Sequence, residues 1–155
     1  LDFMRGTDSR EASRKVDLMA LLETIQEDAR DAGWEVALKG QLARPIRGRP
    51  TALKRCISNL VENAARYGGG AEIVAEDVGG GITIIVQDHG PGIPEEFLEV
   101  AFDPFFRLDS SRARHTGGNG LGLGIARNIA RAHGGDLVLS NRPYGGLSAE
   151  VNLPR

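Results

Sequence analysis

Four polar residues at helical spacing, Asn59, Glu62, Asn63 and Arg66, have the side chains best suited to chemistry in this chain. At about 100° per residue they share one side of a helix. Two asparagines one turn apart are unusual in mid-helix, because asparagine is a weak helix former. An amide oxygen can ligate Mg²⁺, and a guanidinium can bind phosphate oxygens. The stripe therefore indicates a site for a metal ion and phosphate, although a solvated helix face has the same pattern. The opposite, apolar arc consists of Leu53, Cys56, Ile57, Leu60, Val61 and Ala64.

A turn rich in glycine and proline follows a β-rich run at residues 82–87 and reads Asp88-His89-Gly90-Pro91-Gly92-Ile93-Pro94. The Asp88 carboxylate can accept a hydrogen bond from a donor such as an exocyclic amine. Gly90 and Gly92 lack the Cβ atoms that would block the approach of a flat ring. This pattern fits a ligand site, and it also fits a tight turn in which Asp88 bonds its own backbone.

A second glycine cluster spans residues 117–124 and runs directly into a predicted helix. Successive backbone N–H groups at a helix start, together with the helix dipole, bind anions. The spacing of Gly118, Gly120 and Gly124 is not the dinucleotide fingerprint, because no βαβ unit surrounds it, and no Gly-Lys-Ser/Thr follows as in a P-loop. We interpret the cluster as a phosphate site. The alternative is a flexible loop before a permissive helix start.

The composition predicts one globular domain, with 155 residues of which 41% are hydrophobic and 26% charged. No segment approaches the roughly 18 apolar residues of a membrane helix. The lone Cys56 excludes a disulfide framework and a cysteine metal cluster. A net charge of −2 gives no argument for a nucleic-acid partner. Glycine occurs 21 times, about twice its usual share, and the first residue is Leu1 rather than methionine, which suggests a fragment of a longer protein.

The elements expected around these motifs are mostly helices and hairpins. Periodicity predicts helices at about residues 16–32, 51–67 and 121–133, a strand at 34–38, hairpins at 71–87 and 136–153, and a short helix at 95–101. This order predicts an α+β fold, a two-layer α/β sandwich in which helices cover one face of a mixed, mostly antiparallel sheet. Residues 1–15 show no apolar period. We expect them to form a tail or the end of an upstream dimerisation helix, so that the domain itself spans 16–155.

Taken in order, these motifs resemble the catalytic ATP-binding domain of bacterial sensor histidine kinases, which shares the Bergerat fold with gyrase, heat-shock chaperone and mismatch-repair ATPases. Residues 59–67 look like the N box, 88–93 like the first glycine box, 102–107 like the F box and 118–123 like the second glycine box. The resemblance extends over about residues 16–154, and four motifs in order are far more specific than one. The run Ala65–Gly68 is also somewhat similar to osmosensing kinases.

The resemblance implies a role for each matched residue. Asn63 would coordinate Mg²⁺ between the ATP phosphates with Asn59 nearby, and Arg66 would contact phosphate, so these three form the expected catalytic set. The expected adenine-pocket residues are Tyr67, Asp88, Gly90, Gly92 and Ile93. Residues 103–119 would form the ATP lid, with Phe105 packing at its base. The segment expected to hold phosphate at the end of the lid comprises Gly118, Gly120, Leu121, Gly122 and Leu123.

The implied activity is transfer of the ATP γ-phosphoryl group to a histidine on an upstream dimerisation domain that is absent from this chain. None of His89, His115 and His133 lies in an acceptor motif. Related ATPases carry a glutamate where this chain has Asn59, which argues against hydrolysis. A related ATP-hydrolysing enzyme and a non-catalytic partner-binding module stay open as alternatives. The resemblance further implies ATP and Mg²⁺ as cofactors, a downstream response regulator, and a parent protein in the bacterial inner membrane with this domain in the cytoplasm.

Overall fold

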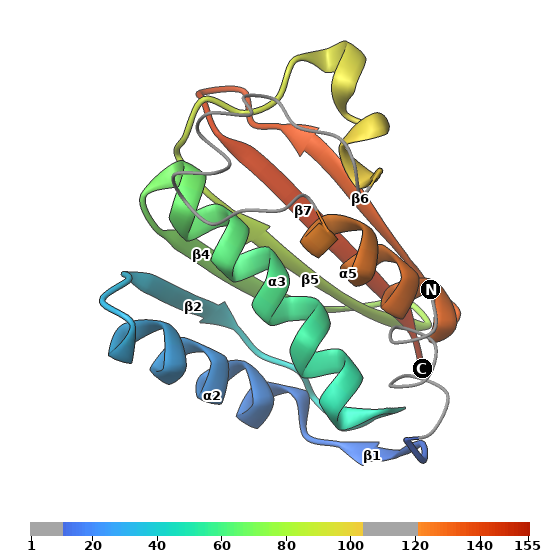
Figure 1. Cartoon of the computed structure of the whole chain (residues 1–155). Helices are drawn as coiled ribbons and strands as arrows, with labels where there is room; N and C mark the ends of the chain where they lie inside the picture. Colours follow the sequence, from blue (N-terminus) through green and yellow to red (C-terminus); the bar gives the residue numbers. More distant parts are fainter. Residues whose placement is uncertain (1–10, 104–120) are drawn as a thin grey trace.

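A computed structural model describes residues 11–103 and 121–155 (Figure 1). Its helices are α2 (Leu18–Asp31), α3 (Pro50–Gly68) and α5 (Leu121–Ala132), with short 3₁₀ helices η1 (Glu95–Phe97) and η2 (Val100–Phe102). Its strands are β1 (Arg14–Val16), β2 (Val36–Gly40), β3 (Ile46–Gly48), β4 (Ala71–Val78), β5 (Gly81–Gln87), β6 (Asp136–Asn141) and β7 (Leu147–Pro154).

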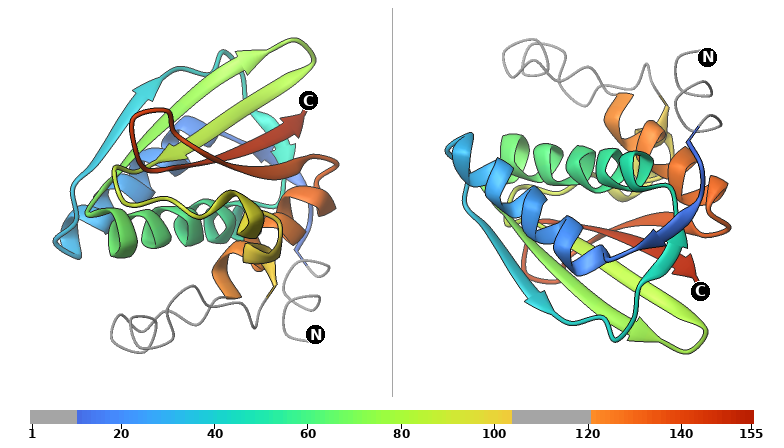
Figure 2. Two further views of the ribbon diagram at one scale, coloured as in Figure 1. Left: turned by 90° about the horizontal axis from the view of Figure 1, so that it is seen from above. Right: turned by 90° about the horizontal axis from the view of Figure 1, so that it is seen from below.

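Five strands form one sheet in the order β2-β4-β5-β7-β6. The pairs β4–β5, β5–β7 and β6–β7 are antiparallel, and β2 pairs with β4 in parallel. The helices lie on one side of this sheet in both views of Figure 2. The predicted α+β sandwich with a mixed, mostly antiparallel sheet is therefore confirmed.

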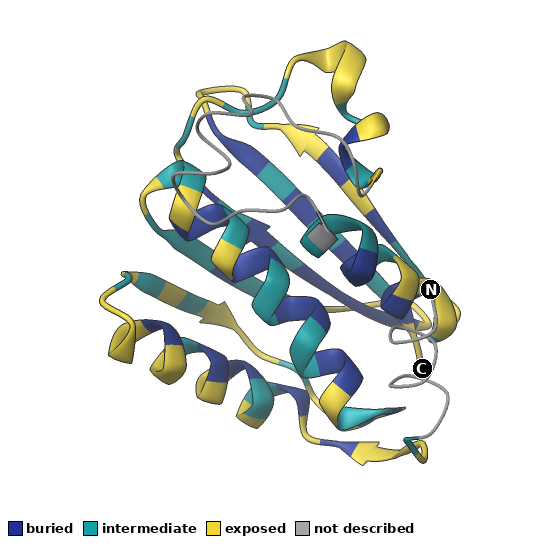
Figure 3. Ribbon diagram, viewed as in Figure 1, coloured by how far each residue is buried: buried dark blue, intermediate teal, exposed yellow. Residues whose placement is uncertain are grey.

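One continuous core joins the sheet to the helices. Strand β7 alternates buried and half-buried residues from Leu147 to Leu153, as expected for a strand with one covered face. Helix α3 packs its apolar arc between α2, α5 and the sheet, and Leu53, Ile57 and Leu60 are almost fully buried. The buried positions in Figure 3 follow this inner layer. The polar side of α3 is thereby held at a fixed orientation above the sheet.

Several boundaries differ from the sequence expectation. Residues 14 and 15, expected in the tail, and Val16, expected to begin the first helix, form β1 and pair with residues 46–48 of β3. The strands of this ribbon have three residues each and are too short to show a period of two. Helix α2 begins at Leu18 rather than at 16, because Asp17 caps it by accepting a hydrogen bond from Ala20 N at 3.1 Å. The strand expected at 34–38 lies at 36–40. The short helix expected at 95–101 is two separate 3₁₀ helices.

Helix α3 receives its N-terminal cap from outside its own sequence neighbourhood. Its N-cap residue, Arg49, makes no capping side-chain bond. Instead, the Glu11 carboxylate accepts hydrogen bonds from Thr51 N at 2.8 Å and Ala52 N at 3.0 Å. Burial raises the pKa of Glu11, but the hydrogen bonds from Thr51 and Ala52 outweigh it, and the pKa lies below its ordinary value. Glu11, three residues before β1, is thus bonded to the start of α3.

We expect Glu11→Ala to lower the free energy of unfolding by about 1 kcal/mol at pH 7, as the loss of a helix cap does. A lowered folded-state pKa means that this stabilisation is present above the pKa of the unfolded chain and disappears as the pH falls through the folded-state pKa. Urea denaturation at pH 7 and below pH 4 should show the difference between wild type and variant shrinking in acid. Glu27→Ala, an exposed change on α2, is the control. A difference that is constant with pH would contradict the capping role.

Candidate functional site

The polar stripe expected on the central helix lies on α3 as the sequence predicts. Asn59 and Asn63 are half-buried, Glu62 and Arg66 are exposed, and the opposite arc is core. Cys56 is buried, and its Sγ donates to Ala126 O at 3.4 Å, so it packs between α3 and α5. The two asparagine side chains therefore sit at the border between core and solvent, where an amide can meet a ligand.

The start of α5 lies against this stripe. Asn59 Nδ2 donates to Gly122 O at 3.3 Å, and a Cβ on Gly122 would lie 3.7 Å from Asn59 Cβ. A Cβ on Gly124 would lie only 2.5 Å from Phe102 O, so this glycine lets η2 pack on the helix. Leu123 is partly buried against the core. The stripe of α3 and the glycine-rich start of α5 thus form one continuous region.

Asp88, directly after β5, is the one buried acidic residue among those that the structure describes, with 6% of its surface exposed. Its backbone N–H donates to Leu147 O at 3.0 Å. Its Oδ1 accepts from Gly90 N at 2.9 Å and from Leu147 N at 3.1 Å. The local turn that the sequence allowed as an alternative is therefore present. Both bonds to the carboxylate use Oδ1, which leaves Oδ2 as the acceptor for a ligand.

Glycines let three segments meet around Asp88. A Cβ on Gly68, the last residue of α3, would collide with the Asp88 side chain. A Cβ on Gly90 would lie 2.6 Å from Tyr67 O and 2.8 Å from Gly68 Cα. A Cβ on Gly146 would overlap the Asp88 carbonyl oxygen. The end of α3, the Asp88 turn and the β6–β7 turn therefore share one close-packed contact that larger residues cannot make.

Residues 48–155 match the family described as Histidine kinase-, DNA gyrase B-, and HSP90-like ATPase. The chain belongs to this family. Among curated relatives it is 47% identical over 155 residues to the sensor histidine kinase GtrS of Pseudomonas aeruginosa, covering 100% of this chain and 32% of the relative. It is 36% identical over 146 residues to the signal transduction histidine-protein kinase BaeS of Escherichia coli, covering 90% and 31%. The chain thus spans about a third of the length of these relatives.

Solved structures lead to the same family. The catalytic domain of histidine kinase ThkA superposes with a TM-score of 0.78 at 28% identity, covering 92% of this chain and 95% of that one. The ATP-binding domain of PrrB from Mycobacterium tuberculosis gives a TM-score of 0.75 at 29% identity, covering 92% and 96%. The molecule is an ATP-binding catalytic domain of the histidine kinase type. Similarity to the osmosensing subgroup stays a prediction.

The structure brings together most of the site residues that the sequence predicts for this kinase-type domain. Asn59, Asn63, Arg66 and Tyr67 follow one another along α3, and Asp88, Gly90, Gly92 and Ile93 form the turn at its C-terminal end. Leu121, Gly122 and Leu123 begin α5. The predictions for Phe105, Gly118 and Gly120, together with the lid, fall outside the described residues.

Sequence reasoning missed several residues that shape this site. In the sequence, Gly68 has the position of an ordinary helix stop and Gly146 that of an ordinary hairpin turn, yet both lie against Asp88. The helix stop is Gly69, which has the left-handed conformation with φ of 78°. Asn141 and Arg142, at the end of β6, bond the Asp88 turn and were not singled out. The paired glycines after Arg142 were the available signal for a close approach there.

A charged cluster anchors the segment that leads from η2 toward residue 104. The Arg127 guanidinium lies over the Phe102 ring at 4.1 Å and bonds Glu99 at 2.7 Å and Asp136 at 3.3 Å. Burial lowers the pKa of Arg127, but its bonds to Glu99 and Asp136 outweigh burial and raise the pKa overall. Arg127 is therefore charged, and it fixes η2 to α5 and β6.

Two further observations concern metals and membranes. Among the residues described, no three His, Cys, Asp or Glu side chains cluster as a metal-binding group. Within residues 11–103 and 121–155, the helices lack the combined length and apolar character needed to cross a bilayer.

We expect Gly90→Ala to destabilise the domain by about 1–3 kcal/mol, because its methyl group meets backbone atoms that cannot move aside easily. The same methyl group should push the turn away from α3 and weaken binding of an ATP analogue in calorimetry. Gly79→Ala is the matched control, because a Cβ there meets nothing within 4 Å. Wild-type stability and affinity in Gly90→Ala would contradict the close approach.

Proposed function

We propose that this domain binds ATP with Mg²⁺ and donates the γ-phosphoryl group to a histidine on a dimerisation domain elsewhere in the parent protein. The observation that carries the proposal is Asp88, a buried carboxylate with one oxygen saturated by backbone amides and the other available. Membership of the kinase-type family supports ATP as the ligand.

The adenine would bind at the C-terminal end of α3. Asp88 Oδ2 would accept a hydrogen bond from the exocyclic amine of adenine, a donor that guanine replaces by an oxygen acceptor. Ile93 is half-buried beside Gly92 and would pack on the ring, as would Tyr67. Because Gly90 approaches Tyr67 O so closely, the turn is held at the edge of α3. Recognition of adenine then follows from the acceptor character of Asp88.

The phosphates would extend from there along α3 toward the start of α5. Mg²⁺ is usually held by one or two protein oxygens, with phosphate and water supplying the rest. The half-buried amide of Asn63 offers one such oxygen on the polar side of α3. When bound, the metal ion would neutralise phosphate charge. Arg66 would bind phosphate oxygens, and the N–H groups of the segment 118–123 would do so at the helix start.

Transfer is favoured over hydrolysis by the chemistry of Asn59. An amide cannot act as a general base, and its Nδ2 already donates to Gly122 O. In the transfer step, a nitrogen of the acceptor histidine bonds to the γ-phosphorus, the bond from that phosphorus to the bridging oxygen breaks, and ADP leaves. His133 is not available as acceptor, because Nδ1 bonds Ile129 O at 2.8 Å and Nε2 accepts from Arg49 N at 3.0 Å.

The cellular setting is part of the proposal and rests on the names of the relatives GtrS, a sensor histidine kinase, and BaeS, a signal transduction histidine-protein kinase. The phosphohistidine would pass its phosphoryl group to a response regulator. The parent protein would be attached to the bacterial inner membrane, with this domain on the cytoplasmic side and without a nucleic-acid partner.

Incubation with radiolabelled ATP, Mg²⁺ and a separate dimerisation-domain fragment of the parent kinase tests the transfer. We expect acid-labile, base-stable label on the fragment, and Asn63→Ala should abolish most of it while leaving metal-free nucleotide binding intact.

Rapid phosphate release without the fragment would indicate an ATPase instead. Failure of the wild type to bind ATP at all would indicate a partner-binding module. Loss of metal-free binding in Asn63→Ala would show that Asn63 is not chiefly a metal ligand.

Asp88→Asn tests the adenine site. The amide retains an acceptor for the two backbone N–H groups but presents a donor where the carboxylate presents Oδ2. We expect the affinity for an ATP analogue to fall at least about tenfold, because two donors then face each other, and the preference for ATP over GTP to shrink. Calorimetry with both nucleotides measures this, with Asp28→Asn on α2 as the exposed control. Unchanged affinity and selectivity would remove Asp88 from this role.

A further inference from the structure

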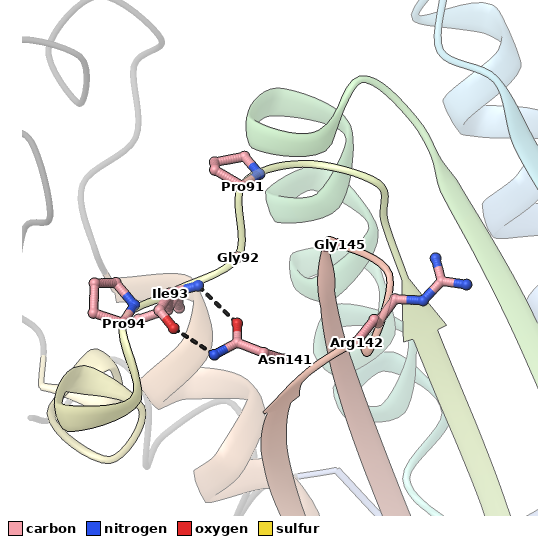
Figure 4. Close-up of a pocket in the computed structure, with 8 residues that line it drawn as sticks. Pro91, Gly92, Ile93, Pro94, Asn141, Arg142 and Gly145 are labelled. Atoms are coloured by element: carbon pink, nitrogen blue, oxygen red, sulfur yellow. Dashed lines mark hydrogen bonds between the residues drawn. The ribbon is translucent and has the colours of Figure 1, made fainter.

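Residues 88–94, the adenine turn of the proposed site, are also bonded by two consecutive residues of the β6–β7 hairpin. Asn141 Oδ1 accepts from Ile93 N at 2.9 Å, and Asn141 Nδ2 donates to Ile93 O at 2.6 Å, so its amide pairs with the backbone as a neighbouring strand would. Figure 4 shows this pair of bonds. Arg142 Nη1 donates to Asp88 O at 2.8 Å. The hairpin thus bonds both the first residue of the turn and its outer end.

The surroundings of Asn141 make these bonds important for the turn. Residues 91–94 and the hairpin residues 141, 142, 145 and 146 line a pocket of about 450 Å³. Atoms that border open space lack packing contacts on that side, so hydrogen bonds matter more for holding the turn there. Asn141 bonds Ile93 beside this pocket, and a Cβ on Gly92 would collide with its Oδ1. Gly92, with φ of 74°, is therefore required both by its conformation and by the Asn141 side chain.

We propose that Asn141 is a positioning residue for the nucleotide base, acting through Ile93 and Gly92 without touching the ligand. Asp88 is fixed independently by Leu147 and Gly90, so the acceptor that identifies adenine does not depend on Asn141. Asn141 would set the distance between residues 92–93 of the turn and the ring of the bound base. Its loss should weaken binding of any nucleotide base and leave the phosphate contacts unaffected. This inference rests on the proposed adenine site.

Asn141→Asp and Asn141→Ala separate hydrogen bonding from packing. Aspartate is nearly isosteric and keeps the acceptor for Ile93 N, but it places a carboxylate oxygen against Ile93 O in place of the donor. Both variants should lower the affinity for a non-hydrolysable ATP analogue about three- to tenfold, leave the weaker affinity for Mg²⁺–tripolyphosphate unchanged, and speed hydrogen exchange at the Ile93 amide.

The control is Asn152→Ala, which removes two side-chain hydrogen bonds from the same hairpin, to Thr83 and Glu150, far along β7 from the turn. It should leave the affinities for both ligands unchanged. A fall in the affinity for both ligands in the Asn141 variants, in step with lower thermal stability, would show a general structural role and overturn the proposal. Wild-type affinity for the ATP analogue in Asn141→Asp would overturn it as well.

Comparing Asp88→Asn with the Asn141 variants distinguishes the proposed adenine site from the proposed positioning role of Asn141. If Asp88→Asn changes the preference between ATP and GTP but the Asn141 variants bind both nucleotides as wild type does, the adenine site stands and the positioning role of Asn141 is wrong. If Asp88→Asn has no effect, the adenine site itself is wrong. A parallel loss of ATP and GTP affinity in the Asn141 variants, with their ratio preserved, supports the positioning role.

Discussion

The arrangement of this domain depends on holding one buried carboxyl group, that of Asp88, in a fixed orientation. Burying a polar group is costly unless hydrogen bonds compensate it. Leu147 N and Gly90 N supply that compensation to Oδ1, and the backbone of Asp88 is in turn bonded through Leu147 O. Because these partners are backbone groups of a strand and a tight turn, they have little freedom to rearrange. The direction of the remaining oxygen is thereby fixed before any ligand arrives.

The same carboxylate explains where glycine is needed. Gly79 and Gly80 are ordinary turn glycines at the open β4–β5 turn, since a Cβ there meets nothing within 4 Å. Gly68, Gly90 and Gly146 differ, because each brings backbone within contact distance of Asp88 or of the neighbouring end of α3. Glycine pairs that look alike in the sequence are therefore required for different physical reasons. The residues that surround each glycine in the folded structure show which reason applies.

The sequence predicts the long elements of this fold and the order of its motifs because those signals are local. The apolar arc of α3 and the two hairpins repeat over enough residues to be recognised. The β1–β3 ribbon and the parallel pairing of β2 with β4 are not predicted. Strands of three residues are too short to show a periodic pattern, and the register between strands far apart in the sequence leaves no local signal. The contact made by Asn141 is not predicted either, for a related reason. Its partner Ile93 lies 48 positions earlier on another element, and a single polar residue at a strand end resembles ordinary turn chemistry.

Helix α3 links the contacts made at its two ends. Its first N–H groups are capped by Glu11, which belongs to the segment preceding β1, and its last residue packs on Asp88. Between these ends run Asn59, Asn63 and Arg66 on a helix of 19 residues whose other face is core. Close-packed interiors have few voids to move into, so a helix packed along its whole length keeps the groups at its two ends in a fixed relation. The polar stripe of α3 and the turn at Asp88 are therefore positioned by one rigid element.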